Sequence, residues 1–357
     1  MYFKNLLATI GNTPLIQLSR ICKDIPGTIL GKVEAYNPGH SAKDRIALYM
    51  VEEAERKGKL KPGCTIVEAT SGNTGYSLAM VCALKGYKCV LTITSKSSQE
   101  KISMLRALGA EVIICPAEAE PDDPSSYYAR AEQLARDIPN AYYLGQNWNK
   151  NNSEAHYHTT GPEIWKQTEG KITHYVCCVG TGGTLSGPAR YLKEQNPNIK
   201  IIGVDAYGSV LKKYWETGML DKSEIHSWKV EGLGKTIIPD NVDFNLIDEF
   251  IKVTDRSSAH RTRQLARMEA LMMGYSSGAA LQAVFQMKKQ LSPSDVVVVL
   301  FPDHGSRYIG KVYDDEWMRQ QGFLGTQHST SQYDSFKRLY KKYVTKYKRY
   351  IRQTLSI

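Results

Sequence analysis

The sequence predicts an α/β protein built on mostly parallel sheets. Short runs rich in β-branched and apolar residues alternate with segments of helical periodicity through most of the 357 residues, which is typical of βαβ units. Several of these runs are apolar throughout, as in sheets that are covered on both faces. The chain is longer than the usual size of a domain with a single hydrophobic core. We therefore expect two lobes, each with a twisted sheet flanked by helices, followed by a basic helical tail.

The elements follow one another in a regular order. The expected strands are residues 65–68, 89–93, 111–114, 175–179, 201–204 and 296–301. The expected helices between them include residues 44–56, 76–84, 100–108, 129–136 and 258–272. The Asn-rich stretch 147–152 is a candidate boundary between lobes. We assign residues 1–36 and 150–324 to a larger lobe, 37–149 to a smaller mobile substrate lobe, and 325–357 to a linker and basic amphipathic helix.

The composition narrows the class of protein. Hydrophobic residues make up 42% and charged residues 23% of the chain, near globular averages. No apolar run approaches the roughly 20 residues of a membrane span, and the N-terminus lacks the pattern of a secretory signal. The seven cysteines include no CxxC pair and lie mostly in apolar runs, as buried reduced thiols do. We therefore expect a cytoplasmic protein.

The net charge of +10 comes from the C-terminal tail. Residues 336–353 hold eight Lys and Arg residues and no acidic residue, and the rest of the chain has 38 basic against 36 acidic residues. Aromatic residues recur at helical spacing in this tail, and Asp334 or Ser335 could cap the helix. It could pack on the body or on a second subunit, or bind an anionic partner or membrane surface. Nothing else in the chain supports binding to nucleic acid.

The first candidate functional residue is Lys43. A Pro-Gly turn at 38–39 delivers Ser41 as a candidate N-cap and puts Lys43 in the first turn of the next helix. A helix N-terminus disfavours positive charge. A partly desolvated lysine there would have a lowered pKa and would be a better nucleophile toward an aldehyde. Taken alone, a solvated surface lysine remains the commoner explanation.

Two glycine-containing loops each follow an expected strand and precede a helix. The first, Thr70-Ser71-Gly72-Asn73-Thr74-Gly75, could bind a carboxylate or phosphate, or could be a plain capped turn. The second, Gly180-Thr181-Gly182-Gly183-Thr184, could bring backbone amides close to an oxyanion, or could be a plain glycine-rich turn. It is not a Walker loop and does not match GxGxxG, so binding of a nicotinamide cofactor is disfavoured.

In this order and at these spacings, the three elements resemble those of the fold-type II pyridoxal 5′-phosphate (PLP) enzymes, and within them the cysteine synthase and cystathionine β-synthase group. Further segments share the resemblance, at residues 10–15, 231–234, 274–280 and 314–324. The resemblance covers about residues 6–324. It leans toward the cystathionine β-synthase branch on residues 230–232 and 303–305.

The resemblance implies PLP bound in the larger lobe and a role for each motif residue. Lys43 would hold PLP as a Schiff base and abstract the substrate's Cα proton. The other cofactor-binding residues would be Asn73 at the 3′-oxygen, Gly180, Thr181, Gly182, Gly183 and Thr184 at the phosphate, and Ser276 at the pyridine nitrogen. Substrate-binding residues would be Thr70, Ser71, Thr74, Gln146 and Gly232. Two alternatives remain open: Ser276 could cap a helix starting near Ser277, and Gln146 could be a loop amide.

Some residues depart from the family pattern. Where relatives usually carry Gly-Gly-Ser-Val-Lys, this chain has Gly39-His40-Ser41-Ala42-Lys43, so His40 could contact substrate or point to solvent. Asn147 stands where relatives commonly place an aromatic residue, and it too could contact substrate. His156 and His158 are interpreted as packing or hydrogen-bonding residues, and we expect no metal site. An N-terminal extension for haem and a C-terminal pair of regulatory domains are not expected either.

We therefore predict a PLP-dependent β-replacement on L-serine, O-acetyl-L-serine or a related β-activated amino acid. The reaction would pass through an aminoacrylate, to which a thiol or another nucleophile adds, and the resemblance implies a homodimer. One alternative is a specialised enzyme that makes a non-protein amino acid. Others are a serine or threonine deaminase and, less favoured, a non-catalytic regulatory paralogue.

Overall fold

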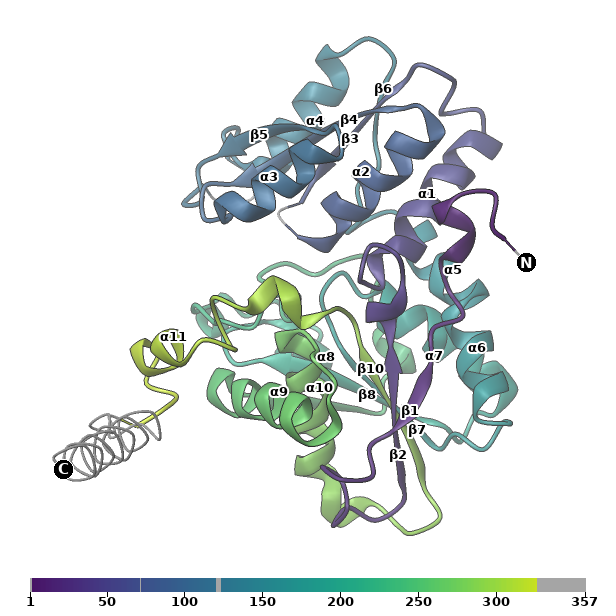
Figure 1. Cartoon of the computed structure of the whole chain (residues 1–357), viewed down its shortest axis with the longest axis vertical. Coiled ribbons are helices and arrows are strands. Elements are labelled where there is room, and N and C mark those ends of the chain that lie inside the picture. The colour runs from purple at the N-terminus through teal and green to yellow at the C-terminus, as the bar shows by residue number, and fades with distance from the viewer. Residues whose placement is uncertain (1, 71, 120–122, 326–357) are drawn as a thin grey trace, which may run out of the picture. The chain divides into compact units, whose positions relative to one another are not determined.

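The computed structural model describes residues 2–70, 72–119 and 123–325 (Figure 1). The chain divides into two compact units, Met1–Val312 and Tyr313–Ile357. Ser71 lies outside the described residues, as do the expected basic helix and its cap candidates Asp334 and Ser335. In the second unit, the short helix α11 (Asp315–Gln320) begins after Asp314, whose side chain accepts a hydrogen bond from the backbone of Trp317.

The larger sheet of the first unit is parallel except at one edge. Among the described residues it has six strands in the order β1-β2-β10-β7-β8-β9, and only the β1–β2 pair is antiparallel. The strands are β1 (Leu15–Gln17), β2 (Thr28–Val33), β7 (His174–Cys178), β8 (Lys200–Ala206), β9 (Glu249–Val253) and β10 (Val296–Phe301). β7, β8 and β10 are almost entirely buried, which explains their apolar composition.

Helices cover both faces of this sheet. In Figure 1, α9 and α10 lie on one side of it and α6 and α7 on the other. The helices of this part are α5 (Asn151–His158), α6 (Thr160–Gln167), α7 (Gly183–Gln195), α8 (Leu211–Thr217), α9 (Asp255–Glu269) and α10 (Tyr275–Gln286). One core cluster joins Tyr175 of β7 and Val298 of β10 to Leu185 of α7. Short 3-10 helices occur at Leu6–Thr9, Glu34–Tyr36, Lys222–Glu224, Phe244–Leu246, Met287–Gln290 and Gly305–Tyr308.

The smaller sheet is parallel throughout, in the order β5-β4-β3-β6. Its strands are β3 (Thr65–Ala69), β4 (Lys88–Thr94), β5 (Glu111–Cys115) and β6 (Ala141–Tyr143), and its helices are α1 (Lys43–Arg56), α2 (Asn73–Lys85), α3 (Gln99–Ala107) and α4 (Tyr127–Asp137). Successive residues of β3 face opposite cores. Ile66 packs with residues of α1, α2 and α3, whereas Val67 packs with residues of α4. This sheet is therefore also covered on both faces.

The predicted α/β fold with parallel sheets is confirmed, and each expected strand is present within two residues at either end. Helices α2 and α7 begin at Asn73 and Gly183, earlier than expected, because the ends of the glycine loops already form their first turns. The prediction that Ser41 is the N-cap of α1 is wrong. Ala42 occupies that position, although Ser41 Oγ accepts a hydrogen bond from Lys43 N at 3.3 Å. The lobe boundaries stay a prediction.

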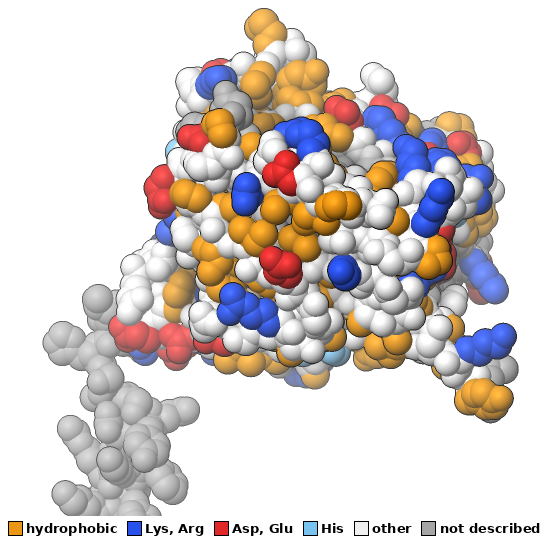
Figure 2. All heavy atoms as spheres, turned by 90° about the horizontal axis from the view of Figure 1, so that it is seen from above, with side chains coloured by type: hydrophobic (Ala, Val, Ile, Leu, Met, Phe, Trp, Pro, Cys, Tyr) orange, Lys and Arg blue, Asp and Glu red, His pale blue; other side chains and the backbone are white. Residues whose placement is uncertain are grey.

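Three further observations bear on the class of protein. All seven cysteines are free and buried, as expected. In the described ranges we find no helix that combines the length and apolar character needed to cross a membrane. On the face shown in Figure 2, Lys and Arg side chains are interspersed with Asp and Glu, which agrees with the near balance of charge outside the tail.

Candidate active site

A pocket of about 440 Å³ lies at the carboxyl ends of the parallel strands. Three residues that line the pocket come shortly after the ends of strands. Thr70 follows β3, Gly180 follows β7 and Asp303 follows β10. Helices begin at this edge of an α/β sheet and present unpaired backbone amides there. Ligands of open α/β sheets accordingly bind at this edge.

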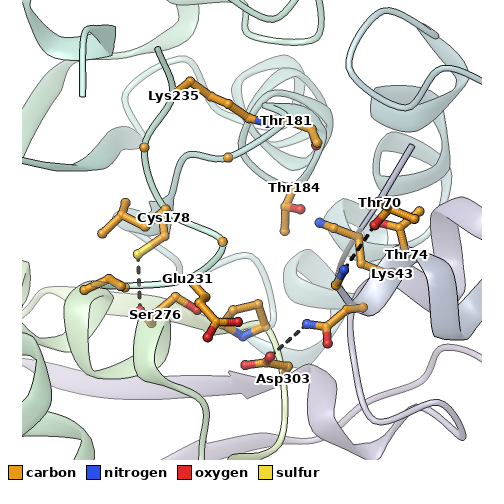
Figure 3. Close-up of a pocket in the computed structure, with 18 of the residues that line it drawn as sticks. Lys43, Thr70, Thr74, Cys178, Thr181, Thr184, Glu231, Lys235, Ser276 and Asp303 are labelled. Carbon is orange, nitrogen blue, oxygen red and sulfur yellow. Dashed lines mark hydrogen bonds between the residues drawn. The ribbon is translucent and has the colours of Figure 1, made fainter. Parts of the chain in front are cut away.

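Lys43 lies on the wall of this pocket as the first residue of α1 (Figure 3). Loss of hydration on burial is the main cause that lowers the pKa of its ammonium group, and the positive charge of Lys235 lowers this pKa further. Asp303 acts in the opposite direction. A lowered pKa increases the fraction of neutral amine, which is the form that attacks an aldehyde or accepts a proton.

The glycine loop between β7 and α7 lines the pocket with Gly180, Thr181, Gly182 and Thr184, whereas Gly183 is not among the lining residues. Gly182 has φ +98°, and a Cβ there would lie 2.6 Å from the backbone nitrogen of Val242. Both the dihedral and the space therefore require glycine. The loop puts two threonine hydroxyls and the first-turn amides of α7 beside the cavity, a set of donors that suits an oxyanion.

At Gly183, a Cβ would lie 2.0 Å from Asn152 Oδ1. Asn152 is fully buried, and its Nδ2 donates to Thr181 Oγ1 at 3.0 Å. The absence of a side chain at Gly183 thus lets Asn152 reach the loop and hold Thr181. Gly183 is therefore needed for the packing of Asn152 against the loop, and it acts on the cavity only through Thr181.

His156 supports the same loop from behind. Its Nε2 lies 3.5 Å from Thr184 Oγ1, and its Nδ1 lies 2.8 Å from Thr160 Oγ1. Burial lowers the pKa of His156 to about 3, so the imidazole is neutral at physiological pH and can accept at one nitrogen while donating at the other. His158 is more exposed and lies 3.6 Å from Glu154. His156 is thus a hydrogen-bonding residue, and the His158 ring packs against the rings of Tyr49 and Tyr157, in agreement with the roles expected from the sequence.

A second wall of the pocket carries Thr70, Thr74 and Gln146. Thr74 Oγ1 donates to Gln146 Oε1 at 2.6 Å. The carbonyl oxygen of Gln146 accepts from Asn152 Nδ2 at 2.8 Å and from Asn241 Nδ2 at 3.0 Å. This wall thus offers hydroxyls, an amide and the N-terminus of α2 to an anionic group. Gln146 lies in a turn, and these hydrogen bonds hold it in a network, so both its role in binding substrate and the alternative of a loop amide stay predictions.

Ser276 also faces the cavity, and its alternative role as a helix cap is wrong. Helix α10 begins at Tyr275 with Gly274 as its N-cap, so Ser276 already lies inside the first turn. The neighbouring Cys178 donates its Sγ–H to the Ser276 carbonyl oxygen at 3.2 Å (Figure 3). That contact fixes the start of α10 against the end of β7.

The two departures from the family pattern are placed differently. His40 does not line the pocket: its side chain is exposed, its φ is +59°, and its ring centroid lies 5.7 Å from that of His304. Asn147 does line the pocket and is buried, and Gly232, which is exposed, lines it too. The structure therefore brings Asn147 and Gly232 to the cavity and leaves His40 on the surface beside it.

Asp303 is a pocket residue to which the sequence interpretation gave no role. Its Oδ2 accepts from Asn73 Nδ2 at 2.8 Å and from the Tyr308 hydroxyl at 2.7 Å, while Arg307 donates to Asn73 Oδ1. Both ends of the Asn73 amide are thus held. Burial raises the pKa of Asp303, and its Oδ1 has no hydrogen-bond partner within the described residues.

Other pocket residues were missed because they come from separate segments. Glu231 accepts from Lys101 at 2.6 Å and also pairs with Lys311. Tyr127 and Tyr128 at the start of α4, and Lys235 in the loop after Gly234, also line the pocket. Of these residues, Asp303 had a usable signal, since it lies two residues after the end of the apolar strand β10, at the sheet edge where ligands bind.

The residues present fit PLP, the cofactor implied by the resemblance. An aldehyde needs an amine with a lowered pKa, which Lys43 supplies. A phosphate needs backbone amides at a helix N-terminus and nearby hydroxyls, which Gly180 to Thr184 supply. The Ser276 hydroxyl can face a ring nitrogen, and the cavity volume lies in the range of small-molecule sites. The individual roles of these residues stay predictions.

Comparisons with known proteins agree with this fit. Residues 6–303 match the family model described as pyridoxal-phosphate dependent enzyme. The chain is 47% identical over 322 residues to a cystathionine β-synthase of Apis mellifera, covering 90% of this chain and 63% of that protein. It is 41% identical over 327 residues to cysteine synthase 1 of Neurospora crassa, covering 90% and 86%.

A solved structure extends the likeness to the fold. The crystal structure of a hydrogen sulfide-producing enzyme from Fusobacterium nucleatum is similar with a TM-score of 0.79 and 36% identity, over 86% of this chain and 98% of that one. The chain spans less than two thirds of the length of several cystathionine β-synthases that it matches. Since the family model alone covers most of the sequence, the chain belongs to the pyridoxal-phosphate dependent enzyme family.

Proposed function

We propose that the protein catalyses β-replacement on L-serine or O-acetyl-L-serine, with a thiol as the incoming nucleophile. The observation that carries this proposal is the shared pocket, where an amine of lowered pKa, an oxyanion loop and a polar wall meet. The names of relatives, cystathionine β-synthase and cysteine synthase, support it. The donor and the thiol that the protein accepts decide whether its activity is that of a cystathionine β-synthase or that of a cysteine synthase.

Lys43 is the proposed proton carrier. Bound PLP would supply an electron sink that makes the substrate's Cα–H bond acidic. The Lys43 amine, once released from the cofactor, is the base that takes this proton, and its lowered pKa keeps it in the accepting form. As an ammonium it can then donate the proton to the departing β-substituent or return it to Cα.

The wall of Thr70, Thr74 and Gln146 is the proposed site for the carboxylate of the amino-acid donor. Its hydroxyls, amide and helix N-terminus suit a carboxylate, and the Thr74–Gln146 hydrogen bond fixes the two side chains relative to each other. Holding the carboxylate here orients the Cα–H bond toward Lys43, since both belong to one pocket. Ser71, which lies outside the described residues, is proposed to add a further donor.

Ser276 is proposed to control how strongly bound PLP would withdraw electrons from the substrate, through its contact with the ring nitrogen. A hydroxyl facing the ring nitrogen accepts or donates a hydrogen bond without carrying a negative charge. A carboxylate in its place would favour a protonated ring nitrogen and a stronger electron sink. The hydroxyl therefore suits reactions that expel a β-substituent promptly.

The test is stopped-flow absorbance of the purified holoenzyme mixed separately with L-serine and O-acetyl-L-serine, without any thiol. We expect the visible absorbance of the bound cofactor to change with at least one donor and to return when a thiol is added. Lys43→Ala should lower the turnover rate by about 10²–10⁴-fold. Lys57→Ala, at the exposed end of the same helix, should leave it unchanged. No change in absorbance with either donor would refute the proposed function.

Three further assignments belong to this proposal. The thiol is the co-substrate, the protein acts as a homodimer, and it resides in the cytoplasm. Sedimentation velocity of the holoenzyme at several concentrations tests the second assignment, and a monomer at all of them would contradict it. A role of the basic tail in binding an anionic partner or membrane concerns residues outside the described part of the chain.

A further inference from the structure

Arg307 joins three segments of the pocket that are far apart in the sequence. It is half-buried and lies in the 3-10 helix Gly305–Tyr308, shortly after β10. Its Nη2 donates to the carbonyl oxygen of Gly39 at 2.6 Å, in the turn that precedes Lys43. Its Nη1 donates to the side-chain oxygen of Asn73, the first residue of α2. One guanidinium thus holds the turn before Lys43, the start of α2 and the segment after β10 together.

The aromatic ring of Tyr76 lies against this guanidinium. The Cζ atom of Arg307 is 5.1 Å from the ring centroid of Tyr76, which is within the range of a cation–π interaction. Tyr76 lies three residues beyond Asn73 on α2, so the two side chains are neighbours on one face of the helix. A planar guanidinium that is held at its face and at two of its nitrogens has little freedom to turn.

These contacts determine how the Asn73 amide is oriented. Its Nδ2 donates to Asp303 Oδ2 at 2.8 Å, and the same oxygen accepts from the Tyr308 hydroxyl at 2.7 Å. A guanidinium donates hydrogen bonds and accepts none, so Arg307 requires the amide oxygen on its own side and leaves the amide nitrogen toward Asp303. The amide nitrogen has two N–H donors, and Asp303 takes one of them. Because Asn73 lines the pocket, the second N–H is a donor for a ligand.

We infer that Arg307, held against Tyr76, is a positioning residue that acts through Asn73 on the 3′-oxygen of bound PLP. This inference rests on the role predicted for Asn73 and deepens the proposed function. An N–H donor at this oxygen stabilises its ionised form and so tunes the electronics of the cofactor. Without Arg307 the amide can turn and present its own oxygen, which would disfavour the ionised form.

The test is the absorbance spectrum of the holoenzyme without donor or thiol, taken at one pH after free PLP has been removed. Bound PLP with an ionised 3′-oxygen absorbs in the visible, and the neutral phenol form absorbs in the near ultraviolet, so the ratio of the two bands reports on this oxygen. Arg307→Met should lower the visible-to-ultraviolet ratio. It should also raise the Kd of PLP about tenfold, the usual effect of losing a charge-assisted hydrogen bond. Tyr76→Leu removes the ring and should shift both quantities in the same direction, by about threefold.

Three control variants separate the orientation of Asn73 from a general effect on folding. Tyr76→Phe keeps the ring and should behave as the wild type. Arg307→Lys keeps the charge without the planar fork and should recover part of the band ratio, which a loss of folding would not allow. Arg106→Met removes an exposed arginine in the last turn of α3, outside the pocket lining, and should change neither the ratio nor the Kd.

A double variant shows whether Arg307 acts through Asn73. In the Asn73→Ala background, Arg307→Met should leave the band ratio unchanged, because the amide that Arg307 orients is no longer present. A further fall of the ratio in that background would mean that the guanidinium acts on the cofactor by another route, and it would overturn the inference.

The remaining contrary results are also distinct. An unchanged band ratio in Arg307→Met overturns the inference, even where the Kd of PLP is raised, because Arg307 would then support the pocket without orienting Asn73. A lowered ratio in Tyr76→Phe overturns the role given to the ring. Since no donor is needed, a wild-type enzyme without any donor response refutes the proposed function and leaves this inference standing. A wild-type protein that binds no PLP refutes both.

Discussion

Arg45→Met tests the buried ion-pair network that anchors α1 two residues beyond Lys43. Arg45 Nε and Nη2 donate to the two carboxylate oxygens of Glu34 at 2.7 and 2.9 Å. Its Nη1 and Nη2 donate to Glu163 at 2.7 and 2.8 Å, and Lys32 shares Glu163 at 2.6 Å. Arg45, Glu34 and Lys32 are at most 3% exposed. The network thus ties α1 to α6 and to the end of β2.

Two estimates of the cost agree. Removing one partner of a buried ion pair costs about 3–5 kcal/mol, since it leaves an uncompensated charge. Burial alone would raise the pKa of Glu34, but the Arg45 guanidinium outweighs burial and holds this pKa at about 2, against an ordinary 4.5. At about 1.4 kcal/mol per pKa unit, that difference corresponds to roughly 3 kcal/mol. We therefore expect Arg45→Met to lower the free energy of unfolding by about 3 kcal/mol at pH 7.

The same pair predicts a dependence on acid. Because the pKa of Glu34 is lowered in the folded protein, its stabilisation is full above the ordinary value of 4.5 and is lost as the pH falls through about 2. Arg45→Met removes the cause of the lowered pKa. The difference in stability between wild type and variant should therefore shrink as the pH is taken below 4.5.

The assay is urea unfolding of the holoenzyme followed by tryptophan fluorescence, with the free energy taken from the midpoint and slope. The matched control is Arg56→Met on the same helix. Arg56 is largely exposed and pairs with Glu53 in solvent, so its loss should leave the midpoint near that of the wild type. If Arg45→Met unfolds at the same urea concentration as Arg56→Met, the buried network does not contribute about 3 kcal/mol to the free energy of unfolding.

Two further predictions concern the pocket's support. Gly183→Ala should reduce PLP content and raise the KM for the donor, because the alanine Cβ would lie 2.0 Å from Asn152 Oδ1 and displace the loop. A titration with PLP followed by fluorescence measures the affinity for the cofactor, and an affinity equal to that of the wild type would contradict this prediction. Burial raises the pKa of Glu68 to about 8, from an ordinary 4.5, so the folded protein keeps the proton on Glu68 where the unfolded chain has lost it. The free energy of unfolding of the wild type therefore falls as the pH rises from about 4.5 to 8. Glu68→Gln should accordingly unfold at higher urea than wild type at pH 8, with a gap that narrows toward pH 5.

Local patterns were sufficient for the parts of the site that lie on one loop. Lys43 and the two glycine loops could be predicted because their function depends on a strand end, a turn and a helix start within a few residues. The supporting contacts could not be predicted. Asn73 and Asp303 are 230 residues apart in sequence, and Lys235 and Asn147 are 88 apart. Nothing in either segment alone indicates its partner.

The sequence did not predict the strands β1, β2, β6 and β9 of the described structure, and the failure at β2 has a similar cause. Lys32 lies in its buried interior, where a charged residue contradicts the apolar pattern of a central strand. The charge is tolerated because Lys32 Nζ donates to Glu163, to the Thr13 carbonyl and to Gln167 at 2.6, 2.7 and 2.9 Å. Those partners come from α6 and from the N-terminal segment. Hydrophobic periodicity is read within one segment of the sequence. It therefore cannot predict a strand whose buried charge is neutralised by residues from other segments.

The sequence marked Asn147 as a departure without giving its consequence, and the contact with Lys235 supplies one. An aromatic residue at position 147 would offer no amide oxygen to the Lys235 ammonium, so the two residues act as a pair. Their effects on the steady-state constants of the enzyme should therefore not add: once Asn147→Leu has removed the acceptor, Lys235→Met should change these constants less than it does in the wild type. Within the described residues, no hydrogen bond joins the glycine loop or Lys43 to the two side-chain atoms of this pair. Because the charge of Lys235 also lowers the pKa of Lys43, this pair couples its side of the pocket to the proposed base.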